Sequence, residues 1–312
     1  MLRAHGFPPF SPDGSLAIAV FAEEDGVTVK HLLRENYGVS AAVLREWKAH
    51  PRGILCNGEA CTVRRVLQAG DVLTLAACRA PTPLKQCTFS GGSQTVPILF
   101  ADAWALAVNK PAGMPTHPSA GHRGDTLLDL ISAALPPGEK VYPINRLDRD
   151  TSGVVLLSRH KLAACVLSAE LQTGGMQKEY CAVTAQPLPA AHGVMRDGMA
   201  READSIIRRT VVLPGDGEDA FTEYRMVGVR NGRYSFRLYP KTGRTHQLRV
   251  QLAHRGAPIV GDTLYGGDPA FARQALHAER LTFFHPCYGR MTVVAQMPQD
   301  MREIWKEDAG NA

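Results

Sequence analysis

Long apolar runs are absent from this sequence of 312 residues. No segment approaches the roughly 18–20 consecutive apolar residues of a membrane-spanning helix. The first twenty residues also lack the continuous apolar segment of a secretory signal, because three prolines and Gly14 interrupt them. We therefore expect a cytoplasmic protein with no membrane partner.

Cysteine pairs and nucleotide-binding motifs are absent too. The seven cysteines are odd in number and none are spaced as C-x-x-C, so neither a disulfide framework nor a zinc site is indicated. The histidines are scattered without an HExxH pattern, and no GxGxxG or P-loop sequence occurs. The sequence therefore predicts no metal, no nucleotide cofactor and no other cofactor.

A strong excess of one charge is also missing, since the formal net charge is only +5. This value permits an anionic partner without requiring one. Single hydrophobic cores stop growing at roughly 250–300 residues, so a chain of this length is expected to form about two domains.

Residues 15–80 are expected to form the first and smaller domain. A helix is predicted in VTVKHLLREN (27–36), and it should stop at Gly38, which suits the left-handed position after a helix. A second helix is predicted at 41–50, with Ser40 as its N-cap and apolar residues at helical spacing.

Short strands and many basic residues complete this segment. Asn57-Gly58 lies between short apolar stretches and suits a type I′ hairpin turn, and residues 66–76 are typical of a turn into a last strand. The basic side chains form either a clamp on RNA phosphates or ordinary solvated helix faces. The candidate phosphate contacts are Lys30, Arg34, Arg45, Lys48, Arg52, Arg64 and Arg65.

Residues 81–95 collect Pro, Ser, Gly and Thr without periodicity and are the best linker candidate. In residues 96–305, strand-like and helix-like segments are intermixed, which indicates one large α+β domain. Strands are predicted within 97–110, 154–158, 178–183 and 234–240, and helices within 160–171 and 246–255.

Two aspartates stand among arginines in residues 144–159. Asp148 and Asp150 alternate with arginines just before an apolar strand. One interpretation is a solvated loop with weak surface ion pairs. The other is a carboxylate that guanidinium groups within ~4–6 Å keep ionised, and that acts as a nucleophile or a base.

A second group of polar residues surrounds the predicted helix at 246–255. Arg244 and His246 stand at its start, Arg249 follows about one turn later, and Gly256 suits its end. The segment is either a basic amphipathic helix on the surface or a clamp for an anion or a carboxylate. The planar fork of an arginine can hold either one through two bonds.

The predicted strand KEYCAV carries Lys178 and Tyr180 on one side, with Glu179 and Cys181 opposite. A tyrosine in a strand is more often a packing residue than a catalytic one. The residues alone leave both roles open.

Four blocks of the chain resemble, in the same order, the RluA-type family of pseudouridine synthases. They are ALAVNKPAGMPTHP (105–118), NRLDRDTSGVVLLSR (145–159), QKEYCAV (177–183) and GRTHQLRVQLAHRGAPIVGDTLYG (243–266). Residues 15–80 resemble, more loosely, the small RNA-binding domain named after a ribosomal small-subunit protein. The resemblance implies an α+β fold. Its catalytic domain would hold a large mixed, mainly antiparallel sheet with flanking helices, beside a small N-terminal α/β RNA-binding domain.

The resemblance also implies roles for single residues. Asp148 matches the family's catalytic aspartate and Tyr180 its active-site tyrosine. Arg249 matches the arginine that pairs with that aspartate, and its fork should hold the carboxylate in one orientation. Arg146 matches the arginine that enters the RNA stack as the target uridine leaves it. Three further side chains are expected to bind the substrate: Lys178, Arg244 and His246.

The implied activity is the isomerisation of specific uridines in structured RNA, ribosomal or transfer, by a monomeric enzyme without a cofactor. The N1–C1′ bond breaks, the base turns, and C5 joins C1′ with no redox change. Asp148 either adds to C6 of the base or acts at the ribose. Two other functions stay open: a catalytically silent RNA-binding module and a carboxylate-dependent hydrolase of a small substrate.

Two positions depart from the family pattern, which usually reads HRLD and LRVH. Asn145 and Gln251 replace imidazoles by amides, which can form hydrogen bonds but cannot titrate. If the two changes are accommodated jointly, their side chains should lie close together or share a polar partner at the rim of the Asp148 pocket.

Overall fold

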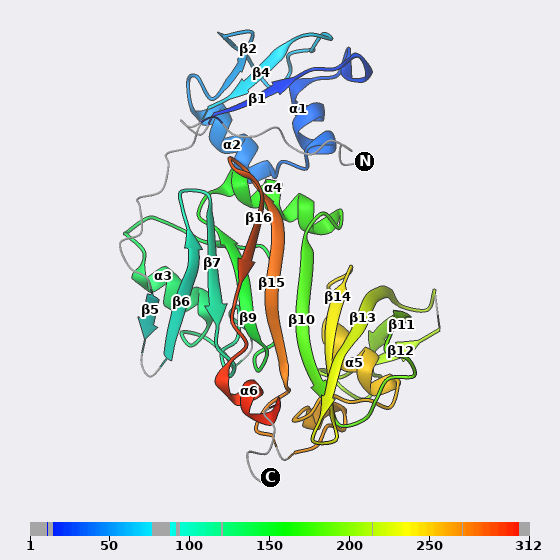
Figure 1. Ribbon diagram of the computed structural model, residues 1–312. Coiled ribbons are helices and arrows are strands. Elements are labelled where there is room, and N and C mark those ends of the chain that lie inside the picture. Colours follow the sequence, from blue (N-terminus) through cyan, green and yellow to red (C-terminus); the bar gives the residue numbers. More distant parts are fainter. Residues whose placement is uncertain are drawn as a thin grey trace.

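The computed structural model describes residues 11, 15–76, 88–91, 94–119, 121–213, 215–269 and 271–305. Two sheets of different size organise these residues (Figure 1). The smaller sheet is N-terminal, and the larger one runs through the rest of the described chain. The predicted α+β class, with a large and mainly antiparallel sheet, is confirmed.

Four strands and short helical segments form the N-terminal unit. Their bounds are β1 Leu16–Ala19, η1 Ala22–Glu24, α1 Val29–His31, η2 Leu32–Asn36, α2 Ala41–Ala49, β2 Ile54–Cys56, β3 Glu59–Ala60 and β4 Val72–Leu75. The strands lie in the order β1-β4-β2-β3, and α1 and α2 lie beside the sheet (Figure 1). This unit buries apolar side chains from both helices and from the sheet in one core.

Most local predictions for this unit are confirmed. Ser40 caps α2, because its hydroxyl accepts a hydrogen bond from the Val43 amide. Asn57 and Gly58 have φ values of 53° and 84°, as the type I′ turn between β2 and β3 requires. The predicted helix at 27–36 begins as α-helix but continues as the wider π-helical turn η2.

Within the described residues, the large sheet contains twelve strands. They are β5 Thr88–Gly91, β6 Gln94–Ala101, β7 Ala105–Lys110, β8 Tyr142–Pro143, β9 Ser152–Ser158, β10 Gln177–Thr184, β11 His192–Arg201, β12 Arg209–Val212, β13 Glu218–Arg230, β14 Arg233–Pro240, β15 Leu276–His285 and β16 Gly289–Val294. Their order is β12-β11-β13-β14-β10-β15-β9-β7-β6-β5, with β16 beside β15 and β8 beside β9. Strands β9 and β15 are parallel, whereas the other pairs in the described part of the chain are antiparallel.

A glycine permits the close contact between β9 and β15. Gly153 has a φ of 120°, and a Cβ added there would lie 2.2 Å from the carbonyl oxygen of Ala278. Any other residue would clash with this backbone. Gly153 lies five positions after Asp148, so the contact fixes the strand into which the Asp148 turn leads.

Helices cover parts of the large sheet. They are α3 Leu127–Ala134, α4 Lys161–Gln172, α5 Gln247–His254, the short η3 Thr263–Tyr265, and α6 Gln299–Trp305. Figure 1 shows α3 beside β5 and β6, α4 beneath the N-terminal unit, and α5 near β13 and β14. Across the described segments, no helix is long and apolar enough to cross a membrane.

The N-terminal unit packs directly on the larger part of the chain. Trp104, Leu162 and Ala163 belong to the same buried cluster as its own core residues. An ion pair between Glu46 of α2 and Lys161 of α4 joins the same two parts. The boundary between two domains stays a prediction.

The segment predicted as a linker, 81–95, is partly a strand. Residues 88–91 form β5, which pairs with β6, and residues 94–95 begin β6, whereas 81–87 and 92–93 lie outside the described residues. The physical reason is Phe89, which is buried in the apolar cluster that includes Leu127 and Ile131 of α3. A single aromatic residue thus anchors a stretch whose composition is otherwise typical of a loop.

Candidate active site

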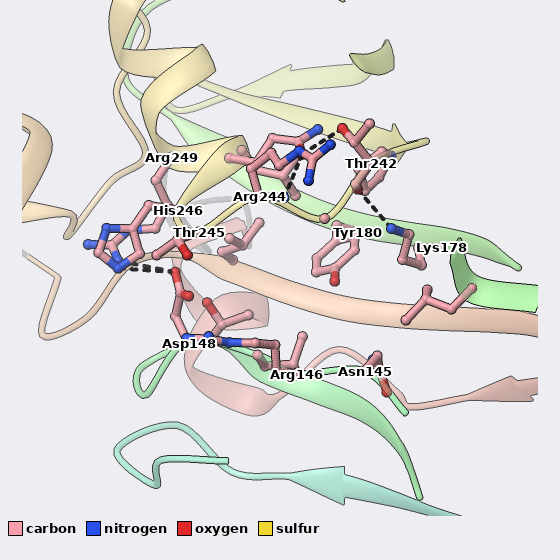
Figure 2. Close-up of a pocket in the computed structure, with 18 of the residues that line it drawn as sticks. Asn145, Arg146, Asp148, Lys178, Tyr180, Thr242, Arg244, Thr245, His246 and Arg249 are labelled. Carbon is pink, nitrogen blue, oxygen red and sulfur yellow. Dashed lines mark hydrogen bonds and ion pairs between the residues drawn. The ribbon is translucent and has the colours of Figure 1, made fainter. Parts of the chain in front are cut away.

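A cleft of about 710 Å³ lies where three parts of the chain meet. They are the turn that precedes β9, the first half of β10, and the loop that leads from β14 into α5. Figure 2 shows side chains from all three parts around one space. All catalytic and substrate-binding residues that the sequence predicts line it: Arg146, Asp148, Lys178, Tyr180, Arg244, His246 and Arg249.

A buried arginine holds Asp148. Nη1 of Arg249 donates a hydrogen bond to Oδ2 of Asp148 at 3.1 Å. Its Nε and Nη2 donate to the two carboxylate oxygens of Asp262, at 2.7 and 2.8 Å. The fork of Arg249 therefore grips Asp262, and the expectation that it holds Asp148 through two prongs is wrong.

Burial explains this division of the guanidinium donors. The Asp262 side chain is 1% exposed and the Asp148 side chain 19% exposed. The more deeply buried carboxylate needs the fuller compensation of its charge. Although burial lowers the pKa of Arg249, its bonds to Asp262 and the charge of Asp148 raise it above the ordinary value, so the cation is permanent. Among the described residues, no donor is found for Oδ1 of Asp148, which leaves one carboxylate oxygen for a substrate.

His246 approaches Asp148 from the start of α5 (Figure 2). It has a left-handed backbone with a φ of 58°, a conformation that costs energy and that occurs often at functional sites. Its Nε2 lies 3.9 Å from Oδ2 of Asp148, and its Nδ1 lies 2.8 Å from the Tyr265 hydroxyl. Burial lowers the pKa of His246, which favours the neutral ring.

Tyr265 determines the tautomer of this ring. Its hydroxyl oxygen accepts a hydrogen bond from the Arg209 amide at 2.9 Å. The hydroxyl proton is therefore free to be donated to Nδ1 of His246, and we infer that the ring proton lies on Nε2, toward Asp148. The Tyr265 ring also packs against the guanidinium of Arg249, 5.1 Å from the ring centre. Tyr265 thus orients both neighbours of Asp148.

Strand β10 contributes Tyr180 and Lys178, which both line the cleft as predicted. Burial and the charge of Asp148 raise the pKa of Tyr180 above its ordinary value, so the phenol is neutral at physiological pH. Burial lowers the pKa of Lys178 to about 8, and its Nζ donates to the Thr242 carbonyl at 2.8 Å. Glu179 faces away from the cleft and pairs with Arg237.

The two remaining arginines of the cleft differ in their freedom. Arg244 donates to the Asp219 carbonyl at 3.0 Å and pairs with Glu218 at 3.1 Å, so β13 holds its side chain. Arg146 is exposed at the mouth of the cleft. We find no hydrogen bond from its side chain to any described residue, which leaves the guanidinium available to a ligand.

The turn that carries Asp148 is fixed from beneath. Lys110 is fully buried, and its Nζ donates to three carbonyls, including that of Arg149 at 2.9 Å. The Thr116 hydroxyl donates to the Leu147 carbonyl at 2.8 Å and accepts from the Leu147 amide at 3.1 Å. The residues before and after Asp148 are therefore both held by buried hydrogen bonds.

Asn145 and Gln251 are accommodated separately, so the expectation of a shared environment is wrong. Asn145 bonds the backbone of β9 on both sides, accepting from the Leu156 amide at 2.7 Å and donating to the Val154 carbonyl at 3.3 Å. Gln251 lies on α5 and faces β11 and β13, where it accepts from Thr222 and donates to Asp197. Each amide uses a donor and an acceptor at once, which suits its own site.

Sequence reasoning assigned no role to Asp262, Tyr265 or Lys110. All three lie inside the blocks that carry the resemblance, so a signal was present. The structure also decides between the two interpretations of the helix predicted at 246–255, because Gln247–Leu252 of α5 are buried. The alternative of a basic helix on the surface is therefore wrong.

The predicted phosphate contacts of the N-terminal unit are mostly exposed. Six of the seven have exposed side chains, whereas Arg34 is partly buried and donates to the Val39 carbonyl. Two backbone hydrogen bonds hold residues 63–65 against the start of α1. They bring Lys30, Arg64 and Arg65 to one part of the surface, and their contact with RNA stays a prediction.

The chain is similar to several known proteins. The sequence profile of RNA pseudouridylate synthases matches residues 105–254. The chain is 35% identical over 287 residues to the RNA pseudouridine synthase YjbO of Bacillus subtilis, covering 90% of this chain and 99% of that protein. It is 31% identical over 300 residues to the ribosomal large subunit pseudouridine synthase D of Xanthomonas campestris, covering 88% and 87%. The solved structure of human RNA pseudouridylate synthase domain containing 4 is similar, with a TM-score of 0.54 and 25% identity over 66% of this chain and 90% of that one.

Proposed function

Because the chain belongs to the family of RNA pseudouridylate synthases, we propose that it isomerises specific uridines in structured RNA with Asp148 as its catalytic carboxylate. Membership makes it an isomerase that acts on RNA. One observation carries the assignment of Asp148. Its carboxylate is the acidic group of the cleft that faces a permanent cation through one oxygen while the other oxygen has no donor among the described residues.

The reaction needs an anionic group at the sugar or the base. Breaking N1–C1′ and forming C5–C1′ moves no electrons to an external acceptor, so the reacting group must be a nucleophile or a base. Asp148 can add to C6 of the uracil or act at the ribose. In both routes Arg249 supports the anion of the free enzyme, and Asp262 keeps Arg249 from turning away.

Tyr180 and Arg146 complete the proposed site. As a neutral phenol, Tyr180 can pack against the flipped base and donate a hydrogen bond to it. Acting as a base toward the C5 proton would require a phenolate, which burial and Asp148 both disfavour. The exposed guanidinium of Arg146 is free to occupy the place that the uridine leaves in the RNA stack, which offsets part of the cost of extrusion.

Large-subunit ribosomal RNA is the substrate class that we propose, because the relative from Xanthomonas campestris carries that substrate in its name. We further propose that residues 15–80 form an RNA-binding domain. Its exposed basic side chains would contact phosphates and add affinity without chemistry, since none of them lines the cleft.

Loss of the C5 hydrogen gives a direct test of the activity. Unmodified large-subunit ribosomal RNA, transcribed in vitro with tritium at C5 of uridine, is incubated with the protein. Pseudouridine formation releases that tritium into water and leaves pseudouridine in the RNA. Release together with a mass-neutral uridine isomer in the digest supports the proposal. RNA that keeps its tritium, when the protein binds it at saturation, contradicts this choice of substrate.

A further inference from the structure

The tip of the β11–β12 hairpin exposes two neighbouring isoleucines. Ile206 is 83% exposed and Ile207 58% exposed. Single exposed apolar residues are common, whereas contiguous exposed apolar surface marks sites of interaction. The roles assigned above to Asp148 and its neighbours leave this tip unused.

The tip is a built turn. The Ser205 hydroxyl accepts hydrogen bonds from the amides of Ile207 and Arg208, at 3.2 and 2.9 Å. The Glu202 amide donates to the Arg208 carbonyl, and the Ser205 amide donates to the Glu202 carbonyl. These bonds satisfy backbone groups of the turn that carries both exposed isoleucines.

The hairpin is also tied to the active site. The Arg209 amide donates to the Tyr265 hydroxyl, which contacts His246 beside Asp148. Beneath the hairpin, Met199 packs with Val250 of α5, the helix that carries Arg249. Ile206 is three residues from Arg209, so the chain between them spans at most about 11 Å.

The charges around the tip favour an anionic polymer. Arginines stand on both sides of the isoleucines at positions 201, 208 and 209, against the acidic Glu202 and Asp204. Glu202 is neutralised by Arg208 at 3.0 Å. An apolar centre with arginines on both flanks matches the base faces and the phosphates of a nucleic acid.

We propose that Ile206 and Ile207 form an apolar wedge that packs on the bases of the substrate RNA next to the extruded uridine, while Arg201 and Arg209 contact phosphates. The inference rests on the proposed function, because base extrusion is what uncovers the apolar faces of neighbouring bases. Isoleucine is among the side chains that proteins insert between base steps. The wedge and Arg146 would then support the opened stack from two sides of the cleft.

The test compares two double variants. Ile206→Ser/Ile207→Ser removes the wedge. Val227→Ser/Val229→Ser removes two aliphatic side chains, 54% and 49% exposed, near the C-terminal end of β13. The probe is the unmodified large-subunit ribosomal RNA transcript. For both variants we measure Kd by filter binding at several salt concentrations, and the single-turnover rate constant of pseudouridine formation at saturating RNA.

The isoleucine variant should raise Kd by about tenfold, since two aliphatic side chains lose their burial against the bases. The slope of log K against log salt should stay that of the parent, because no phosphate contact is lost. The rate constant at saturation should change less than twofold, and the valine control should match the parent throughout.

A parent-like Kd in the isoleucine variant overturns the wedge. So does a parent protein that sediments as a dimer and becomes monomeric in this variant while its Kd is unchanged, because the tip would then serve self-association. A parent that binds the transcript but forms no pseudouridine contradicts the proposed function instead. The two failures are distinguishable, since the Kd comparison does not depend on turnover.

Discussion

Replacing Arg249 by lysine separates charge from geometry at the active site. The guanidinium makes three bonds, two to Asp262 and one to Asp148. The single ammonium group of lysine keeps the charge but cannot reach both carboxylates in the same way. Because Asp262 is 1% exposed and costly to leave uncompensated, the ammonium should remain with it. Asp148 then loses its donor.

The magnitude follows from the bond that is lost. A hydrogen bond to a charged group contributes about 1.5–3 kcal/mol, which corresponds to a fall of roughly 10- to 100-fold in rate if the bond is needed in the transition state. The single-turnover rate of pseudouridine formation at saturating RNA should fall by this factor in Arg249→Lys. The Kd for the RNA should change little, because the side chain is buried and its donors already bind Asp262 and Asp148.

A matched control lies at the end of the same helix. Arg255 binds both oxygens of Asp197, at 3.0 and 3.1 Å, and makes no contact with Asp148. Arg255→Lys should lower the thermal midpoint about as much as Arg249→Lys but leave the rate near that of the parent. Parent-like turnover by a folded Arg249→Lys variant, or an equal loss of rate in the control, would refute the reasoning.

Three further variants test other parts of the account. Burial raises the pKa of Glu170 to about 7, so the folded protein loses stability as pH rises from about 4.5 to 7. Glu170→Gln should therefore melt at a higher temperature than the parent at pH 8 and at the same temperature at pH 4, and a difference that does not depend on pH would count against this cause. Asn145→Asp should lower the free energy of unfolding by about 1–3 kcal/mol at pH 7, because a carboxylate cannot donate to the Val154 carbonyl, and an unchanged urea midpoint would show that this bond contributes nothing. Arg52→Gln/Arg64→Gln/Arg65→Gln should flatten the slope of log K against log salt by about 2–3, and a parent-like slope would leave these side chains as ordinary solvated residues.

Local signals in the sequence predicted local structure well. The Ser40 cap and the Asn57-Gly58 turn depend on residues within a few positions of each other, and both are confirmed. Composition alone predicts a linker at 81–95, because it does not show that one residue, Phe89, is buried against residues distant in the sequence.

The candidate site shows the same limit. The resemblance identified the side chains that line the cleft, because the four blocks that carry them occur in the same order as in the family. It did not reveal that Arg249 divides its donors between two carboxylates. That division depends on how deeply Asp262 is buried, and burial arises only when η3 folds back on α5. For the same reason, the separate surroundings of Asn145 and Gln251 were unreadable from their positions in two similar motifs.

The central claim is that Asp148 performs the chemistry, and Asp148→Asn tests it most directly. The amide has nearly the same shape, so packing should persist, but it is neither an anionic nucleophile nor an effective base. The measurement is single-turnover pseudouridine formation on unmodified large-subunit ribosomal RNA, with a thermal melt and a binding titration of the same preparation. We predict a folded protein that binds the RNA at least as tightly as the parent and forms no pseudouridine. Parent-like turnover by a folded Asp148→Asn variant would contradict the account.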